Sequence, residues 1–201
     1  MRKSNRFNTP IELVLATGNT NKLLEIKAVL PKWISVVDMR TAGYDQEIAE
    51  TADTLEGNAR LKALTVYDAL GKNCMADDTG LVVEALGGAP GVYSARYAGP
   101  GCSDQDNVKK LLKAMEGCSN RAAKFRTVIH LIWSGNEHRF VGEVDGEIGL
   151  EPRGENGFGY DPVFIPKGGN KTFAELSLQE KNAISHRAKA VQKLATFFES
   201  F

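Results

Sequence analysis

The sequence predicts a mixed α/β protein in which helices flank a central mixed β-sheet, in two lobes with an active-site cleft between them. Short apolar runs alternate with helical patterns through the first half of the chain, and a β-ribbon pattern follows in the second half. No repeat or low-complexity tract interrupts this order. Alternating βα units are typical of parallel strands, and a ribbon adds antiparallel strands, so we expect both in one sheet.

Composition excludes several classes of function. The 201 residues carry 25 Lys and Arg against 25 Asp and Glu, which gives a net charge of zero. A neutral chain lacks the broad positive field that binds nucleic acid polymers or anionic membranes, so any phosphate recognition must be local. No apolar run approaches the roughly 20 residues that cross a bilayer. We expect no nucleic acid polymer and no membrane among the partners.

The cysteines indicate a compartment. Cys74, Cys102 and Cys118 are an odd number of widely spaced thiols without a CxxC pair. This pattern favours a reducing environment, and we expect a cytoplasmic protein without disulfides or a zinc site. The basic, polar residues 1–10 are interpreted as a flexible leader, and residues 11–201 as a single two-lobed domain.

The first predicted strand covers residues 11–16 and ends at Thr17. A helical pattern follows until Pro31 ends it. A second strand is predicted over residues 34–38, and a second helix over residues 55–70 with Asp53 or Thr54 as its cap. Its apolar residues recur at spacings of three and four: Leu55, Ala59, Ala63, Val66 and Leu70.

Two strand pieces, residues 74–76 and 81–83, flank residues 77–80, which we interpret as an acidic turn. A third helix is predicted to start at Ser103, because Asp106 three residues later resembles a capping box. The apolar face of that helix contains Val108, Leu111, Leu112 and Met115.

The second half of the chain reads mainly as strands. Residues 124–133 and 139–144 are predicted to pair antiparallel, with Asp145-Gly146 as a turn after them. Residues 163–165 form a further short strand, and a single helix ends the chain. The apolar face of this last helix is expected to contain Ile184, Ala188, Val191, Ala195 and Phe198.

The first candidate site lies where the first strand passes into the first helix. Backbone N–H groups at a helix N-terminus, a glycine that permits close approach and a lysine suit a polyphosphate. The GK[ST] ending of a P-loop is missing, and an ordinary helix N-cap with a surface lysine fits the same residues equally well. The segment consists of Thr17, Gly18, Asn19, Thr20, Asn21 and Lys22.

The second candidate site contains Asp77 and Asp78. Adjacent carboxylates repel one another unless a cation or hydrogen-bond donors compensate, and Mg²⁺ is the natural cation for oxygen ligands. Glu50 offers a further oxygen, but a solvated turn fits the two aspartates equally well. Asn58 and Lys62 share one face of the second helix. This face either lines the place where a phosphate binds or is exposed to solvent.

The third candidate site offers groups that suit a purine base. Phe158 lies between two glycines and can present its ring to a heterocycle, while Asp161 can accept from a ring N–H or a sugar hydroxyl. Donors that a 6-keto oxygen would accept, and a 6-amino group would not, come from Lys181, His186 and Arg187. A core aromatic and a polar helix face are the alternative interpretations.

These segments, taken together and in this order, resemble the non-canonical purine nucleotide pyrophosphatase family, the inosine and xanthosine triphosphate pyrophosphatases. The resemblance runs from residue 11 to the C-terminus and implies an elongated two-lobed fold, usually a homodimer. It also implies Mg²⁺-dependent hydrolysis between the α and β phosphates. The matching segments are LATGNTNK (15–22), ETADTLEGNARLKA (50–63), ADDTGLVVEALGGAPGVYSARYAG (76–99), GFGYDPVF (157–164) and AELSLQEKNAISHR (174–187).

The resemblance implies roles by position. The triphosphate would be held by residues 17–22, with Lys62 and Thr79, and the magnesium by Glu50, Asp77 and Asp78. Asp78 would also be the base toward the attacking water. The base pocket would contain Phe158, Gly159, Tyr160, Asp161, Lys181, Ser185, His186 and Arg187. Thr79 stands where many members carry serine, and Gly57 stands where a glutamate often precedes the asparagine matched by Asn58.

The predicted function is therefore hydrolysis of ITP, dITP and XTP to the monophosphate and pyrophosphate, which cleanses the nucleotide pool. A related pyrophosphatase for modified pyrimidine or methylated nucleotides is one alternative. A catalytically silent purine-nucleotide-binding module is another, against which the intact acidic residues and Lys22 argue. The sequence does not indicate how GTP is rejected at C2, or which of the three substrates is preferred.

Overall fold

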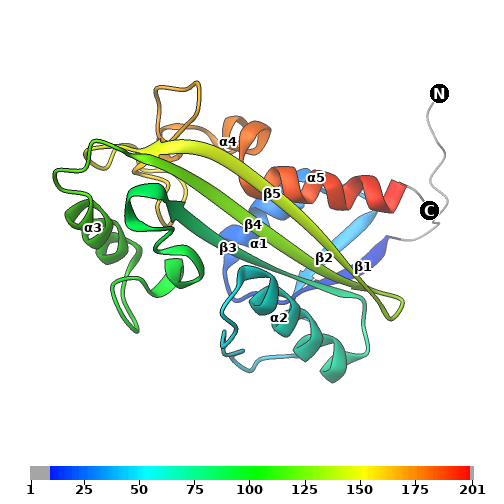
Figure 1. Ribbon diagram of the computed structural model, residues 1–201. Coiled ribbons are helices and arrows are strands. Elements are labelled where there is room, and N and C mark those ends of the chain that lie inside the picture. Colours follow the sequence, from blue (N-terminus) through cyan, green and yellow to red (C-terminus); the bar gives the residue numbers. More distant parts are fainter. Residues whose placement is uncertain (1–9, 200–201) are drawn as a thin grey trace, which may run out of the picture. The chain divides into compact units, whose positions relative to one another are not determined.

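The computed structural model describes residues 10–199 (Figure 1). The predicted leader, residues 1–10, lies outside this range except for the exposed Pro10. The strands are β1 Ile11–Leu15, β2 Ile34–Asp38, β3 Cys74–Val83, β4 Ala122–Trp133, β5 Asn136–Ile148 and β6 Phe164–Pro166. The α-helices are α1 Thr20–Val29, α2 Leu55–Leu70, α3 Asp104–Ala114, α4 Leu178–Ile184 and α5 His186–Glu199. Short 3-10 helices cover Glu84–Leu86, Gly91–Arg96 and Phe173–Glu175.

The six strands form one mixed sheet in the order β2-β1-β3-β4-β5-β6. β1 pairs in parallel with β2, from Ile11 opposite Ile34 to Leu15 opposite Asp38, and also in parallel with β3. β5 pairs antiparallel with β6. The predicted mixed α/β class is thus confirmed.

The described residues divide into two compact units. The first contains residues 10–78, 128–140 and 191–199, and the second contains residues 79–127 and 141–190. Each unit has its own core of buried apolar side chains. The first core contains Val14, Ala16, Met39, Ala63, Val66, Cys74, Ala76 and Ile132. The second core includes Leu81, Val83, Leu111, Phe125, Val163, Phe164 and Phe173.

The helices of the first unit begin where their capping residues predict. The Thr54 side chain accepts a hydrogen bond from the Gly57 N–H and caps α2, which ends at Gly71 in the left-handed conformation with φ 63°. Gly is favoured at this position because it lacks a Cβ. No helix within residues 10–199 combines the length and apolar character needed to cross a membrane.

The acidic turn predicted at residues 77–80 is wrong, because β3 runs unbroken from Cys74 to Val83. Asp, Thr and Gly favour turns in isolation. Here the two buried carboxylates lie beside lysines from α1 and α2, which compensate their charges. A strand can therefore continue through them. Since consecutive strand residues point to opposite faces, Asp77 and Asp78 face different sides of the sheet.

The turn predicted at Asp145-Gly146 is also wrong, because both residues lie inside β5. Gly146 pairs with Pro166 of β6, and a Cβ at Gly146 would lie only 2.3 Å from the Ile165 carbonyl oxygen. The glycine therefore permits a close approach of two strands rather than a change of direction. β6 itself lies one residue later than predicted.

The single last helix predicted from the sequence is two helices, α4 and α5, which break at Ser185. Ser185 has extended backbone angles, φ −69° and ψ 156°, and its Oγ accepts a hydrogen bond of 3.2 Å from the Ala188 N–H. Ile184 is consequently 39% exposed rather than buried. The other predicted core residues of this helix are buried as expected: Ala188, Val191, Ala195 and Phe198.

Candidate active site

The predicted phosphate loop forms the N-cap of α1. Asn19 Oδ1 accepts hydrogen bonds from the backbone N–H groups of Asn21, at 2.9 Å, and Lys22, at 3.3 Å. Thr17 Oγ1 accepts one from the Asn19 N–H at 3.1 Å. Three backbone N–H groups of this segment therefore already have a partner, as in an ordinary helix N-cap. No atom lies within 4 Å of a Cβ built at Gly18, which leaves room for a close approach there.

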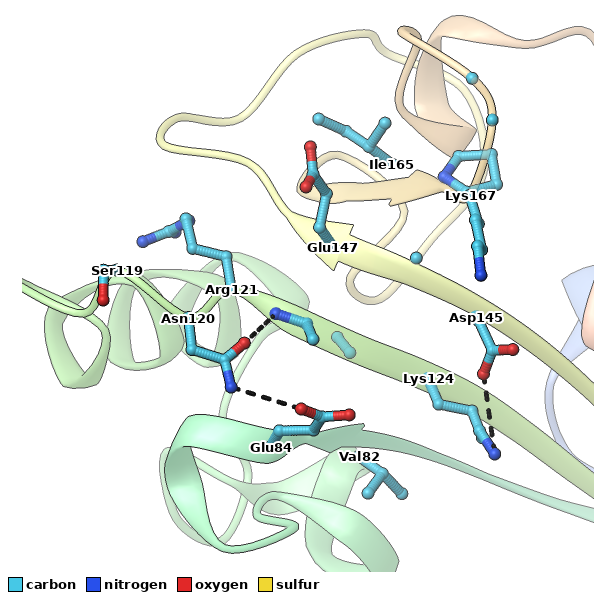
Figure 2. A pocket seen from close by; sticks show the side chains of 16 residues that line it. Val82, Glu84, Ser119, Asn120, Arg121, Lys124, Asp145, Glu147, Ile165 and Lys167 are labelled. Carbon is cyan, nitrogen blue, oxygen red and sulfur yellow. Dashed lines mark hydrogen bonds and ion pairs between the residues drawn. The ribbon is translucent and has the colours of Figure 1, made fainter.

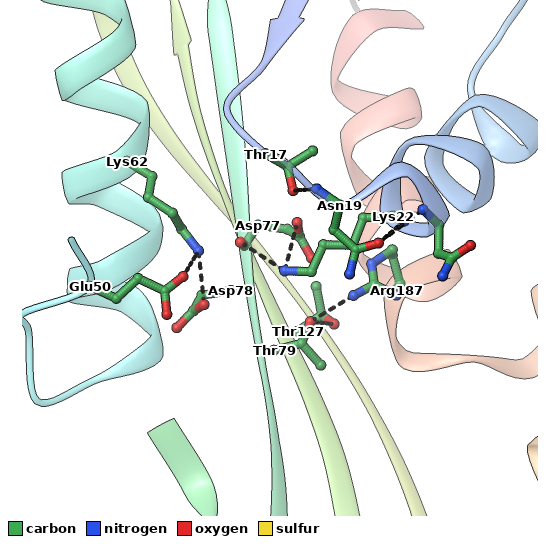
Figure 3. A network of polar contacts seen from close by, with 11 residues as sticks. Thr17, Asn19, Lys22, Glu50, Lys62, Asp77, Asp78, Thr79, Thr127 and Arg187 are labelled. Atoms are coloured by element: carbon green, nitrogen blue, oxygen red, sulfur yellow. Dashed lines mark hydrogen bonds and ion pairs between the residues drawn. The ribbon is translucent and has the colours of Figure 1, made fainter. Parts of the chain in front are cut away.

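The two aspartates of β3 each pair with a different lysine (Figure 3). Lys22 Nζ of α1 lies 3.2 Å from Asp77 Oδ1, and Lys62 Nζ of α2 lies 2.9 Å from Asp78 Oδ1. The expectation that adjacent carboxylates need compensating groups is thus met by two lysines, one for each aspartate. The alternation of strand side chains separates the two pairs. Lys22 is also no surface lysine, since only 16% of its side chain is exposed.

Glu50 joins the pair formed by Lys62 and Asp78. Lys62 Nζ donates to Glu50 Oε1 at 2.5 Å and to Asp78 Oδ1 at 2.9 Å, so one ammonium bridges two carboxylates. Lys62 and Asp78 are both buried. A buried group of this kind is favourable only when its charges are compensated. The alternative of a solvated face for Lys62 is therefore wrong.

Burial raises the pKa of Asp78 above its ordinary value; Glu50 raises it further, while Lys62 and Lys22 oppose this shift. For Lys62, burial by itself lowers the pKa, but the negative charges of Asp78 and Glu50 outweigh burial and hold it above its ordinary value. Asp78 is therefore a stronger proton acceptor than an exposed aspartate, which is a property of catalytic bases.

Two carboxylates of this group have the chemistry of magnesium ligands. Asp78 Oδ2 is buried and has no hydrogen-bond partner, so a cation would satisfy it. Within residues 10–199, no three His, Cys, Asp or Glu side chains form a group that could hold a metal. Mg²⁺ is commonly bound by one or two carboxylates plus phosphate oxygens and water, which Glu50 and Asp78 can supply in part. Asp77 faces the other side with Lys22, so its place in the metal set stays a prediction.

Asn58 lies one turn before Lys62 on α2 and is fully buried. Its Oδ1 accepts a hydrogen bond of 2.9 Å from the Ala52 N–H, while its Nδ2 is buried without a partner. Leaving a buried donor unpaired costs about 1–3 kcal/mol. An unpaired buried donor is rare in native structures, so Asn58 Nδ2 is a candidate contact for a ligand.

In the second unit, four residues predicted for the base pocket lie together. Lys181 Nζ donates to Asp161 Oδ2 at 2.6 Å, and the same oxygen accepts from the Phe158 N–H at 2.9 Å. Lys181 Nζ lies 5.0 Å and Arg187 Cζ 5.5 Å from the centroid of the Phe158 ring. A Cβ at Gly157 would lie 2.1 Å from Asp161 Oδ2, so this loop needs its glycine. Phe158 is half-buried beside two cations.

Three other residues of the predicted base pocket are held by the protein's own packing. The Tyr160 ring lies in the second core and its hydroxyl donates to the Ser94 carbonyl oxygen at 2.9 Å. Ser185 caps α5, and His186 stacks on Phe125 with ring centroids 4.4 Å apart. For Tyr160 and Ser185 the structure supports a structural role instead of contact with a base.

Thr79 links two buried side chains of the second unit. Its Oγ1 lies 2.6 Å from Thr127 Oγ1 and accepts a hydrogen bond of 3.1 Å from Arg187 Nη2. The sequence analysis missed Thr127, which is fully buried on β4. The only signal was a polar residue inside an apolar strand pattern, and threonine is common in ordinary strands.

An open cavity of about 940 Å³ also lies in the second unit (Figure 2). It contains none of the predicted site residues. Several of its polar side chains contact one another: Lys124 Nζ lies 3.6 Å from Asp145 Oδ1, and the Asn120 amide donates to Glu84 Oε2 at 3.3 Å. Buried, charged side chains are a better indication of chemistry than cavity volume, so we locate the candidate site by them.

The fold and these residues define a mixed α/β protein with buried lysine–carboxylate groups on its central strand. Comparison with known proteins identifies the family: the model of the Ham1 family matches residues 13–197. This chain belongs to the Ham1 family, as the resemblance predicted.

Individual relatives are similar in sequence to this protein along nearly the whole chain. A dITP/XTP pyrophosphatase from Flavobacterium johnsoniae is 52% identical over 184 residues, which cover 92% of this chain and 96% of the relative. A dITP/XTP pyrophosphatase from Bacillus subtilis is 47% identical over 193 residues, which cover 94% of this chain and 98% of the relative.

Solved structures give the same result. The Ham1 protein of Staphylococcus aureus has a TM-score of 0.84 and is 42% identical, covering 94% of this chain and 98% of that protein. A HAM1 protein from Coxiella burnetii has a TM-score of 0.87 and is 40% identical, covering 95% and 100%.

Proposed function

We propose that this protein hydrolyses non-canonical purine nucleoside triphosphates, namely ITP, dITP and XTP, to the monophosphate and pyrophosphate. The observation that carries the proposal is the buried Asp78, whose Oδ1 binds Lys62 and whose Oδ2 lacks a partner. Relatives about half identical over more than nine-tenths of this chain are named dITP/XTP pyrophosphatases. Membership of the Ham1 family supports an enzyme over a silent binding module.

In the proposed mechanism, Asp78 accepts a proton from the water that attacks the α-phosphorus. Burial raises the pKa of Asp78, which strengthens this carboxylate as a base. Pyrophosphate leaves in line with the attacking water, and Lys22 and Lys62 stabilise the charge that develops on it. No covalent intermediate with the protein is needed.

Glu50 and Asp78 would hold Mg²⁺, which when bound neutralises phosphate charge and polarises the phosphoryl oxygens. The chain's own contribution is to keep these carboxylates charged and oriented. In the free protein, Lys62 does so through its two hydrogen bonds, at 2.5 Å and 2.9 Å. The Asn58 amide adds a buried donor one helical turn away.

Selectivity for the base is proposed to come from the second unit. Lys181, His186 and Arg187 are donors that suit a 6-keto oxygen, and all three are buried. At the same position adenine presents a donor in its 6-amino group instead of an acceptor, which makes ATP a poor substrate. The half-buried ring of Phe158 would contact the face of the base.

We also propose that the protein acts in the cytoplasm as a homodimer on a free nucleotide. Three free thiols and a zero net charge support the compartment and the absence of a polymeric nucleic acid partner. Static light scattering at several protein concentrations tests the dimer. A constant mass of one chain would contradict it.

The function is tested by pyrophosphate release from ITP, dITP, XTP, GTP, ATP and dUTP, each with and without Mg²⁺. We expect turnover of the first three with Mg²⁺ only, and kcat/KM for ATP at least about 100-fold lower. Preference for dUTP would favour a pyrimidine house-cleaning enzyme instead. Binding of ITP without pyrophosphate release from any of the six would favour a silent binding module.

A further inference from the structure

The Lys62 ammonium occupies the position between the two carboxylates that would bind a metal. It lies 2.5 Å from Glu50 Oε1 and 2.9 Å from Asp78 Oδ1, and both Lys62 and Asp78 are buried. We propose that Lys62 is an exchangeable counter-ion: it neutralises Glu50 and Asp78 in the free protein and moves to phosphate when a nucleotide binds. The free protein would then bind divalent metal weakly, and metal and nucleotide would bind together.

The charges around Lys62 support weak binding of a divalent metal to the free protein. Two carboxylates and one ammonium leave a single net negative charge, and affinity for a divalent cation depends on the number of charged ligands. A positive charge a few ångströms from a second cation opposes its binding strongly at a buried site. One oxygen of each carboxylate already accepts a hydrogen bond from Lys62, so the ammonium competes with a metal for both groups.

The side chain of Lys62 is suited to exchange partners. Lysine carries its charge on a flexible four-carbon stem and shifts between acceptors without a fixed geometry. A triphosphate would supply new acceptors for the ammonium and further oxygen ligands for the metal. Lys22 cannot perform the same exchange at these carboxylates, because it pairs with Asp77 on the other face of β3.

The proposal depends on the proposed function only for the identity of the nucleotide, and its test needs no nucleotide. Mn²⁺ is titrated into the protein by calorimetry and by electron paramagnetic resonance. We expect Lys62→Met to bind Mn²⁺ at least about tenfold more tightly than the wild type, because the competing charge is gone. Lys72→Met is the matched control: it removes the same charge from the same unit, where Lys72 pairs with the exposed Glu12 at 3.0 Å.

Two further substitutions at Lys62 keep the proposal testable if Lys62→Met does not fold. Lys62→Gln keeps a hydrogen-bond donor toward the carboxylates but removes the charge, so it should also bind Mn²⁺ more tightly. Lys62→Arg keeps the charge and should stay weak. Affinities within about threefold of wild type in both neutral variants would overturn the proposal. So would an equal gain in Lys72→Met, or a gain in Lys22→Met alone, which would place the metal at Asp77.

The counter-ion role of Lys62 and the proposed enzymatic function can fail independently. A chain that releases no pyrophosphate but whose Lys62→Met variant gains Mn²⁺ affinity would keep the counter-ion role and lose the enzymatic proposal. A chain that hydrolyses ITP with unchanged Mn²⁺ affinity in the neutral variants would keep the enzyme and lose the counter-ion role.

Discussion

The hydroxyl oxygens of Thr79 and Thr127 lie 2.6 Å apart, and Arg187 donates to Thr79 at 3.1 Å. Thr79 contacts both side chains, so Thr127 supports the oxygen to which Arg187 donates. We therefore regard Thr127 as a positioning residue for the proposed base pocket.

Thr127→Val should raise KM for ITP several-fold with little change in kcat, because Arg187 loses a fixed partner while the residues around Asp78 are unchanged. It should also lower the free energy of unfolding by about 1–3 kcal/mol, since the partly buried Thr79 hydroxyl loses a hydrogen bond. Thr127→Ser keeps the hydroxyl and should restore the wild-type KM. Equal KM values in the Val and Ser variants would contradict the positioning role. Steady-state kinetics and urea unfolding provide these measurements.

Asp78→Asn should lower kcat for ITP by about 100-fold or more, because the amide cannot accept the proton of the attacking water. The side chain keeps its shape, so the fold should remain and a thermal melt should still be cooperative. Asp145→Asn is the matched control, since Asp145 is an exposed partner of Lys124 in the cavity of Figure 2. If Asp78→Asn retained near-normal pyrophosphate release, Asp78 would not be the base.

Gly142→Ala should lower the free energy of unfolding by about 3 kcal/mol, at the upper end of overpacking costs. A Cβ at Gly142 of β5 would lie 2.0 Å from the His186 carbonyl oxygen and 2.5 Å from the Ala190 nitrogen, and neither backbone atom can turn away. Gly149→Ala is the control, because its nearest atoms would lie 3.5–3.6 Å away. Urea denaturation of both variants tests the difference, and equal stabilities would show that α5 can move aside.

The stability of the protein should depend on pH through His130. Burial lowers the pKa of His130 below its ordinary value of 6.5, although Glu137, 2.8 Å from Nε2, opposes this shift. The unfolded chain therefore binds the proton first as the pH falls. The contribution of the neutral histidine is present above pH 6.5 and is lost as the pH drops from 6.5 toward the folded pKa.

His130→Gln, which keeps a donor for Glu137, should make the free energy of unfolding less dependent on pH in this range. Chemical denaturation of both proteins between pH 7 and pH 5 measures the two slopes. Identical slopes would mean that His130 titrates alike in the folded and unfolded chains.

Local signals predicted most helices and strands because they depend on neighbours in the chain. The Ser103–Asp106 capping box begins α3, and Thr54 caps α2, as expected. The errors fall where distant contacts outweigh local preference. Gly146 has the local character of a turn, but the approach of Ile165 from β6 keeps it in a strand. Ile184 has the spacing of a core residue, but the break at Ser185 turns it outward.

The same division applies to the candidate site. The order of the motifs along the chain was sufficient to identify the family. It also selected Asp78, Glu50, Lys22 and Lys62, because residue types and their spacing can be read from the sequence alone. Which lysine pairs with which carboxylate was not predictable. That pairing depends on the side of β3 to which each aspartate points, whereas the local sequence predicts a turn, in which side chains do not alternate between two faces.

The sequence by itself therefore determined the class of protein, the elements with strong caps and the chemical groups at the site. Only the tertiary structure decided that Asp77 binds Lys22, that Lys62 bridges Glu50 and Asp78, and that Thr127 supports Thr79. The physical reason is the separation in sequence of the residues that interact. A helix cap or a periodic apolar face depends on residues within about four positions of one another in the chain. A buried ion pair instead joins residues such as Lys22 and Asp77, which come together only when α1 packs against the sheet.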